Sequence, residues 1–171
     1  IDNSAFSRCT GLTSINVNDA NTVYSSDEGV LFNKDKTELV LYPEGRTETF
    51  YIVPNSVTSI GNSAFNSCKS LTSITMSSSV ANIGRDAFGD CTGLTSVTIP
   101  DSVKYIGHNA FCGCTSMTSV TIPDSVTDIG FGAFQNCESL TSVTIFGGLW
   151  RIGSYAFYHC SRLTSITIPN S

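Results

Sequence analysis

The chain has 171 residues, enough to enclose one substantial core. Charged residues make up only 13% of it, about half their usual share, and 25 Ser and 20 Thr supply much of the polar surface instead. The net charge of −5 excludes the concentrated Lys and Arg of a nucleic-acid-binding surface. No apolar run is long enough for a membrane-spanning helix, and no segment has the composition of a signal peptide.

A 23-residue repeat organises the sequence. The dipeptide Ala-Phe recurs, followed each time by a Cys three positions after the Phe, with the Phe at Phe6, Phe65, Phe88, Phe111, Phe134 and Phe157. The last five copies keep one constant interval, whereas a much longer interval separates Phe6 from Phe65. One such unit cannot bury its own apolar residues, so a fixed period of this length indicates stacked units that cover one another.

The chain opens with a partial unit, and its segment 13–17 is the first of six strand-like phrases. In most of these phrases apolar β-branched residues alternate with Ser or Thr, which predicts an extended strand with one buried and one hydroxyl-bearing face. We expect the six strands to lie in one parallel sheet, at residues 13–17, 72–76, 95–99, 118–122, 141–145 and 164–168. A Val-x-x-Ile-Gly phrase follows most of them, as at Val103 and Val126.

A variant unit at about residues 18–53 interrupts the period, before regular units at about 54–171. Within it, residues 29–32 and 38–42 are strand-like and residues 33–37 are turn-like, which predicts a β-hairpin. Nine of the 23 charged residues lie between Asp27 and Glu48, so we expect a charged hairpin that protrudes into solvent. Two interpretations stay open for this hairpin, a solvated structural insert and a binding prong.

The complete unit, Leu-x-x-Ile-x-Ile-Pro-x-x-Val-x-x-Ile-Gly-x-x-Ala-Phe-x-x-Cys, resembles the BspA-like leucine-rich repeats of bacterial and protist surface proteins. The resemblance covers nearly the whole chain. It implies a mainly β, right-handed solenoid with one parallel sheet, a location at the cell surface or outside the cell, and a role in adhesion or protein binding. It implies no catalytic residues. We also expect no cofactor.

The repeat is incomplete at both ends. Residues 1–6 align with residues 60–65, inside a unit, and residues 169–171 align with residues 123–125, just before the next expected Val. Solenoids need polar terminal units, and neither end has one. We therefore expect residues 1–171 to form a single solenoid that is a fragment of a longer array.

Six of the seven cysteines share one repeat position: Cys9, Cys68, Cys91, Cys114, Cys137 and Cys160. We expect them to form a column of reduced, buried thiols, because parallel side chains about 5 Å apart have poor geometry for disulfides and for tetrahedral zinc. Cys112 lies outside this register, and we expect it to be exposed.

Enzyme chemistry finds little support in the sequence. The two histidines, His108 and His159, occupy variable repeat positions, and the nucleophile-elbow, phosphate-loop, dinucleotide-loop and zinc-protease motifs are absent. Asp35 lies in a turn that lacks the Gly and closing Glu of a calcium loop. We therefore expect neither a catalytic site nor a bound metal.

Aromatic residues replace the usual repeat residues near the C-terminus, and we predict that several are exposed. Rings with polar tips are typical of protein interfaces and sugar-binding platforms. The candidate binding residues are Phe131, Phe146, Trp150, Tyr155 and Tyr158. The alternative is that further repeat units cover them.

These observations favour a non-enzymatic surface domain whose partner is a protein or glycoprotein and which neither binds nucleic acid nor inserts into a membrane. A passive spacer that projects other domains is the main alternative. A third alternative is ice binding, because we expect hydroxyls such as those of Ser96 and Thr98 to form outward rows.

Overall fold

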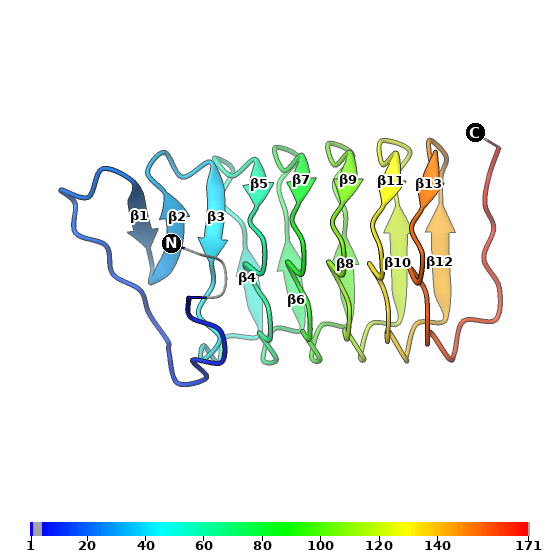
Figure 1. The fold of residues 1–171 in the computed structure, drawn as a ribbon, viewed down its shortest axis with the longest axis horizontal. Coiled ribbons are helices and arrows are strands. Elements are labelled where there is room, and N and C mark those ends of the chain that lie inside the picture. The colour runs from blue at the N-terminus through cyan, green and yellow to red at the C-terminus, as the bar shows by residue number, and fades with distance from the viewer. Residues whose placement is uncertain (2–4, 171) are drawn as a thin grey trace.

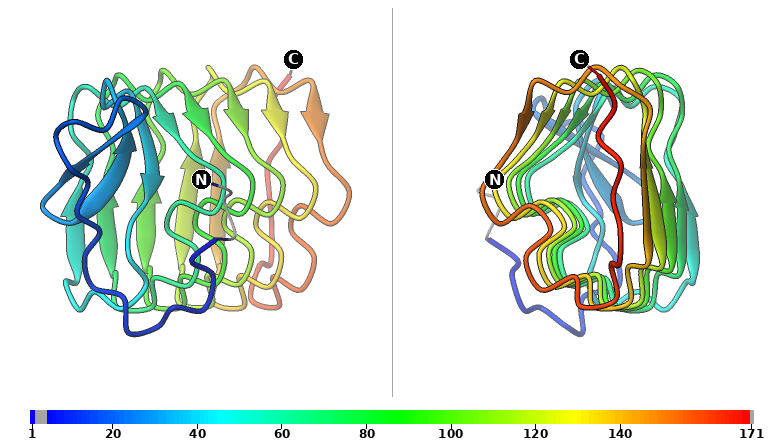
Figure 2. Two further views of the ribbon diagram at one scale, coloured as in Figure 1. Left: turned by 60° about the vertical axis from the view of Figure 1, so that its left-hand side comes forward. Right: turned by 90° about the vertical axis from the view of Figure 1, so that its right-hand side faces the viewer.

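In a computed structural model that describes residue 1 and residues 5–170, the chain winds into a regular stack of coils (Figure 1). Each regular coil contributes one strand to each of two sides of the stack (Figure 2). The first side, here called the hydroxyl face, holds β4 (Phe50–Ile52), β6 (Ser73–Thr75), β8 (Ser96–Thr98), β10 (Ser119–Ile122) and β12 (Ser142–Ile145). The second holds β5 (Ser59–Ile60), β7 (Asn82–Ile83), β9 (Tyr105–Ile106), β11 (Asp128–Ile129) and β13 (Arg151–Ile152).

The predicted β-solenoid is confirmed, with a second sheet that the sequence analysis did not predict. The Val-x-x-Ile-Gly phrases form it: β5, β7, β9, β11 and β13 pair in parallel as consecutive neighbours. On the hydroxyl face, β8, β10 and β12 form one parallel sheet and β4 and β6 form another.

Two of the six predicted strands do not form. Segment 13–17 lies against the start of the hairpin and does not join the hydroxyl face. The Ile15 amide donates to the Gly29 carbonyl at 2.9 Å. Segment 164–168 is also irregular, and its Ile166 and Ile168 side chains are exposed, so it lacks the packing that fixes the other strands.

A column of stacked Phe rings runs through the core. Consecutive rings from Phe65 to Phe157 lie 5.0–5.4 Å apart between centroids, with interplanar angles of 12° or less. Tyr42 extends the column at 5.2 Å from Phe65. This separation is close to the spacing of hydrogen-bonded strands, about 4.8 Å, so ring packing and strand pairing impose the same rise per coil.

Hydroxyl groups connect neighbouring coils. Thr95 Oγ1 donates to the Thr72 carbonyl at 3.1 Å, and Thr141 Oγ1 donates to the Thr118 carbonyl at the same distance. These bonds join equivalent positions of successive coils without placing like charges about 5 Å apart. They give one physical reason for the abundance of Ser and Thr.

The glycine that ends each Val-x-x-Ile-Gly phrase allows the backbones of adjacent coils to approach closely. A Cβ atom on Gly107 would lie 2.4 Å from the Gly84 carbonyl oxygen. On Gly130 it would lie 2.7 Å from the Gly107 carbonyl carbon. Any side chain at this repeat position would therefore push two coils apart.

The predicted hairpin is present but does not protrude. Strands β2 (Val30–Asn33) and β3 (Glu38–Leu41) pair antiparallel, and β1 (Tyr24–Asp27) adds a third strand beside β2. Strand β3 pairs in parallel with β5, so the hairpin forms the N-terminal end of the second sheet (Figure 1). Its apolar side chains are largely buried, which is why the expectation of a solvated projection was wrong.

The thiol column is largely as predicted. Cys68, Cys91, Cys114, Cys137 and Cys160 are buried, and all seven cysteines are free thiols. Most column thiols donate weak hydrogen bonds to Phe carbonyls one coil back, as from Cys114 Sγ to Phe88 O at 3.2 Å. Burial raises the pKa of the Cys91 thiol to about 12.

Two cysteines depart from the prediction. Cys9 is exposed, because its partial coil lies outside the packed column. Cys112, which we expected to be exposed, is only partly exposed. Burial, and then the nearby Asp90 and Asp86 carboxylates, raise the pKa of the Cys112 thiol.

Removing one ring from the stack should be costly. We expect Phe111→Ala to lower the free energy of unfolding by about 3–5 kcal/mol, because the ring is fully buried between two others. Chemical denaturation measures this loss. A loss below about 1 kcal/mol would contradict a close-packed ring column.

The glycine position should tolerate no side chain. We expect Gly107→Ala to destabilise the fold by about 1–3 kcal/mol, because the added methyl meets backbone atoms that cannot rotate away. Gly11→Ala is the matched control, since a Cβ there has no neighbour within 4 Å. Equal melting temperatures for the two variants would argue against the close approach.

Thiol labelling should separate three classes of cysteine. With a bulky reagent, the native protein should label quickly at Cys9, slowly at Cys112 and not at Cys91, Cys114 or Cys137, because only thiolates within reach of the reagent react. Unfolded protein should label at all seven sites. Mass spectrometry of the labelled peptides gives the order, and rapid native labelling of Cys114 would contradict it.

Candidate binding surfaces

Three of the five predicted binding residues come together on the surface. The Phe131 and Tyr155 rings meet edge to face at 5.3 Å, and Tyr155 meets Tyr158 in the same way at 5.3 Å. Tyr158 in turn stacks on the His159 imidazole at 4.2 Å. We call Phe131, Tyr155, Tyr158 and His159 the aromatic cluster. All four side chains are exposed.

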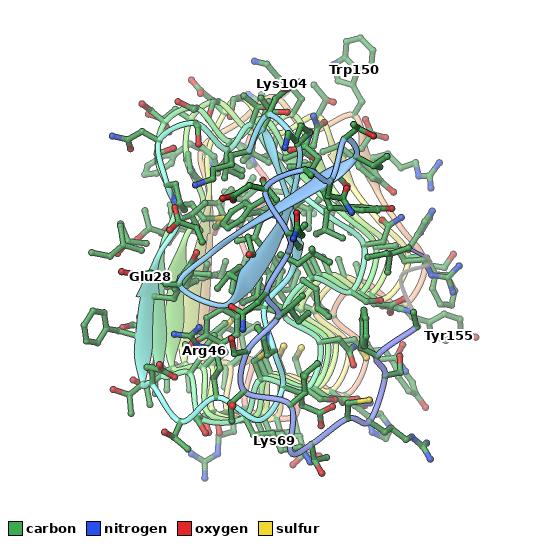
Figure 3. The ribbon with its side chains drawn as sticks, turned by 90° about the vertical axis from the view of Figure 1, so that its left-hand side faces the viewer. Glu28, Arg46, Lys69, Lys104, Trp150 and Tyr155 are labelled. Carbon is green, nitrogen blue, oxygen red and sulfur yellow. The ribbon has the colours of Figure 1, made fainter. Side chains whose placement is uncertain are left out.

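The other two predicted residues lie elsewhere. Trp150 is 85% exposed just before β13, and Figure 3 places it on a different side of the stack from Tyr155. Phe146 is 67% exposed at the end of β12, beside Asp101 and Asp124. Neither ring packs against another ring among the described residues. The five therefore do not form one surface.

The backbone at the aromatic cluster is unusual. Tyr155 has φ +60°, in the left-handed region that disfavours bulky side chains. The equivalent residues of earlier coils share this conformation and are small or turn-forming: Ser63, Asp86, Asn109 and Gly132. His159, with φ +59°, occupies a second such column with Ser67, Asp90, Gly113 and Asn136. The last described coil thus places Tyr155 where the earlier described coils use Ser, Asp, Asn or Gly. It places His159 in a column that holds the same residue types in the regular coils and Arg8, at φ +62°, in the first partial coil.

Polar groups border the aromatic cluster. The Phe131 amide donates to Nδ1 of His108 at 2.9 Å, so one imidazole nitrogen is occupied by the backbone of the next coil. The Tyr105 ring lies edge to face with His108 at 6.3 Å. The cluster can therefore offer ring faces, phenol hydroxyls and an imidazole to a ligand.

A second surface, at the opposite end of the stack, was missed by the sequence analysis. Phe50 and Ile52 of β4 are each 64% exposed. They pair in register with Ser73 and Thr75, so apolar side chains stand where the later coils carry hydroxyls. This departure from the repeat was a signal in the sequence, but the irregular spacing of the variant unit concealed the alignment.

Beside these two residues lies a hollow lined also by Glu28, Tyr42, Arg46, Glu48 and Tyr51. The Arg46 guanidinium lies 5.0 Å from the Tyr42 ring centroid and donates to both Glu48 carboxylate oxygens, at 2.7 and 3.2 Å. It also donates to the Glu28 carbonyl. The hydrogen bond from Arg46 lowers the pKa of Glu48, and burial raises the pKa of Tyr42 and of Tyr51.

The described residues contain no group of three His, Cys, Asp or Glu side chains placed to hold a metal ion. They also form no helix long and apolar enough to cross a membrane. Both surfaces offer rings, hydroxyls and backbone groups, which are suited to noncovalent contact.

Similar proteins come from bacteria. A leucine-rich cell surface protein from Faecalibacterium prausnitzii matches with a TM-score of 0.90 and 32% identity, over 98% of this chain and 44% of that one. The pneumococcal vaccine antigen PcpA matches with a TM-score of 0.80 and 27% identity, over 91% of this chain and 39% of that one. The chain thus spans less than half the length of these two proteins.

A leucine-rich repeat protein from T. pallidum matches with a TM-score of 0.71 and 29% identity, over 84% of this chain and 67% of that one. No curated protein sequence matches the chain. The model of the BspA-type leucine-rich repeat region matches residues 44–163 in six copies. With this match over more than half of its residues, the chain belongs to the BspA-type leucine-rich repeat family.

Proposed function

We propose that the chain is a non-enzymatic binding domain of a cell-surface or secreted protein, and that it holds a protein or glycoprotein ligand at the aromatic cluster. The observation that carries this proposal is the conformation of Tyr155. A bulky ring in the left-handed region costs free energy, and such strain persists where function requires it. The edge-to-face contacts hold the rings in a fixed arrangement before any ligand arrives.

The fold supports a binding role. Fully buried rings and paired strands make the coil rigid, so exposed side chains are presented with little loss of entropy on binding. Tyr and Trp are enriched among the residues that dominate binding energy. The Faecalibacterium protein is described as a cell surface protein, which supports the proposed location.

A passive spacer is the competing function. A spacer needs only the packing of its coils, so the left-handed position of Tyr155 would carry Ser, Asp, Asn or Gly, as it does in the earlier coils that the structure describes. The ring at Tyr155 has no role in such a protein. Stability and binding should therefore respond to its removal in opposite directions if the cluster binds a ligand.

We expect Tyr155→Asn to leave the melting temperature unchanged or to raise it, because Asn suits the left-handed conformation that Asn109 already adopts. The same variant should weaken capture of a ligand by about 2 kcal/mol, roughly thirtyfold, if the ring is a main contact. Surface plasmon resonance against a panel of purified extracellular-matrix and mucosal glycoproteins measures the capture, and thermal unfolding measures stability.

Trp150→Ala is the matched control, since it removes a large exposed ring outside the aromatic cluster. We expect it to bind as the unaltered chain does. Equal losses for Trp150→Ala and Tyr155→Asn would show that general surface hydrophobicity causes capture. A chain that binds no member of the panel, and that Tyr155→Asn destabilises, would favour the spacer.

A further inference from the structure

Strand β4 is the N-terminal edge of the hydroxyl face. The Ser73 amide donates to the Thr49 carbonyl at 3.2 Å, and the Val53 amide donates to the Thr75 carbonyl at 2.9 Å. Alternate residues of a strand direct their backbone groups to opposite sides. The N–H and C=O groups of Phe50 and Ile52 therefore point away from β6. Among the described residues, β6 is the only strand paired with β4.

Natural edge strands are protected by being very short, by Lys or Pro, or by a covering segment. Strand β4 is short, but within the described part of the chain it carries no Lys or Pro and has no strand paired on its outer side. Residues 50–52 are Phe-Tyr-Ile. The repeat would place segment 13–17 beside β4, but this segment bonds to the start of the hairpin instead. Two large apolar side chains next to free backbone groups are the features by which an added strand is held.

An unpartnered polar group lies beneath the adjoining hollow. The Tyr42 side chain is 2% exposed, and its hydroxyl has no hydrogen-bond partner among the described residues. The later coils place Phe at this position of the ring column, so packing does not require the hydroxyl. The hydroxyl oxygen is itself buried, so it is a polar group beneath the hollow and not a contact point for a ligand.

The charges around the hollow indicate which sign of charge a ligand should carry. The Arg46 charge is neutralised by the two-point contact with Glu48. The Glu28 carboxylate forms no ion pair among the described residues, and Figure 3 shows Glu28 and Arg46 close to the edge of the hydroxyl face. An incoming segment with a Lys or Arg side chain is therefore favoured over an acidic one.

We infer that the free edge of β4 binds an extended, basic segment of a partner protein as an added strand. Its backbone pairs with Phe50 and Ile52, its apolar side chains pack on theirs, and its cation pairs with Glu28. This site is separate from the aromatic cluster and does not depend on the function proposed for it.

A strand of the repeat itself provides a defined probe, because strands of this sequence pair with one another in the stack. The probe is a synthetic peptide of residues 93–100 that carries the substitution Ser96→Lys, and a scrambled peptide of the same composition is the control. With the full chain, we expect saturable binding of the probe. We also expect hydrogen exchange to slow about tenfold or more at the Phe50 and Ile52 amides, as pairing would protect them.

Substitutions at one position separate backbone pairing from side-chain packing. Ile52→Pro removes an N–H that points away from β6, so the fold should stay intact while probe affinity falls about tenfold or more. Ile52→Thr keeps the N–H and introduces the residue that β6 carries at the paired position, Thr75. We expect it to retain most of the affinity. Glu28→Gln should reduce affinity for the Lys-containing probe to that of the unsubstituted peptide.

Three results would overturn the inference. Equal probe affinity for Ile52→Pro and Ile52→Thr would show that the edge N–H takes no part. Slow exchange at Phe50 and Ile52 in the monomeric free chain would show that the chain covers its own edge. Protection that appears only as protein concentration rises, with dimers in analytical ultracentrifugation, would make a second copy the occupant.

Discussion

The distance between one coil and the next is the constraint on which the rest of the structure depends. Strand pairing, ring stacking and the hydroxyl bridges all require a rise of about 5 Å, and a glycine makes that rise possible where the backbones meet. Because several interactions share one distance, a residue that enlarges it weakens all of them at once. This coupling explains why whole sets of positions recur together in every unit of the sequence.

The two candidate binding surfaces lie where the repeat is broken. At the aromatic cluster, Tyr155 takes a backbone conformation that suits a much smaller residue. At β4, Phe50 and Ile52 take the positions of hydroxyl-bearing residues. The segment expected beside β4, residues 13–17, bonds to the start of the hairpin instead. At Tyr155 the chain carries a strained backbone, which lowers stability. At β4 it exposes apolar side chains, which lowers solubility. Such departures are expected at functional sites rather than at random along an array.

Much of the fold was predictable because its information is local and repeated. The alternation in Ser96–Thr98 predicts a strand, and the same phrase one unit later predicts its neighbour. The second sheet was not predicted, because Val-x-x-Ile-Gly forms strands of only two residues that show no alternation. The exposure of Trp150 followed from its variability, but its separation from Tyr155 depends on the coil's cross-section, which spacing does not encode.

The direction of the bonds between coils has a mechanical consequence. The hydroxyl bridges and the strand pairs join each coil to the next, so they lie along the length of the stack (Figure 1). A pull between the two ends loads the last coil's bonds first and opens coils one after another. Each opened coil releases one repeat unit, roughly 80 Å of extended chain. Under tension such an array lengthens in steps while its remaining coils keep their shape.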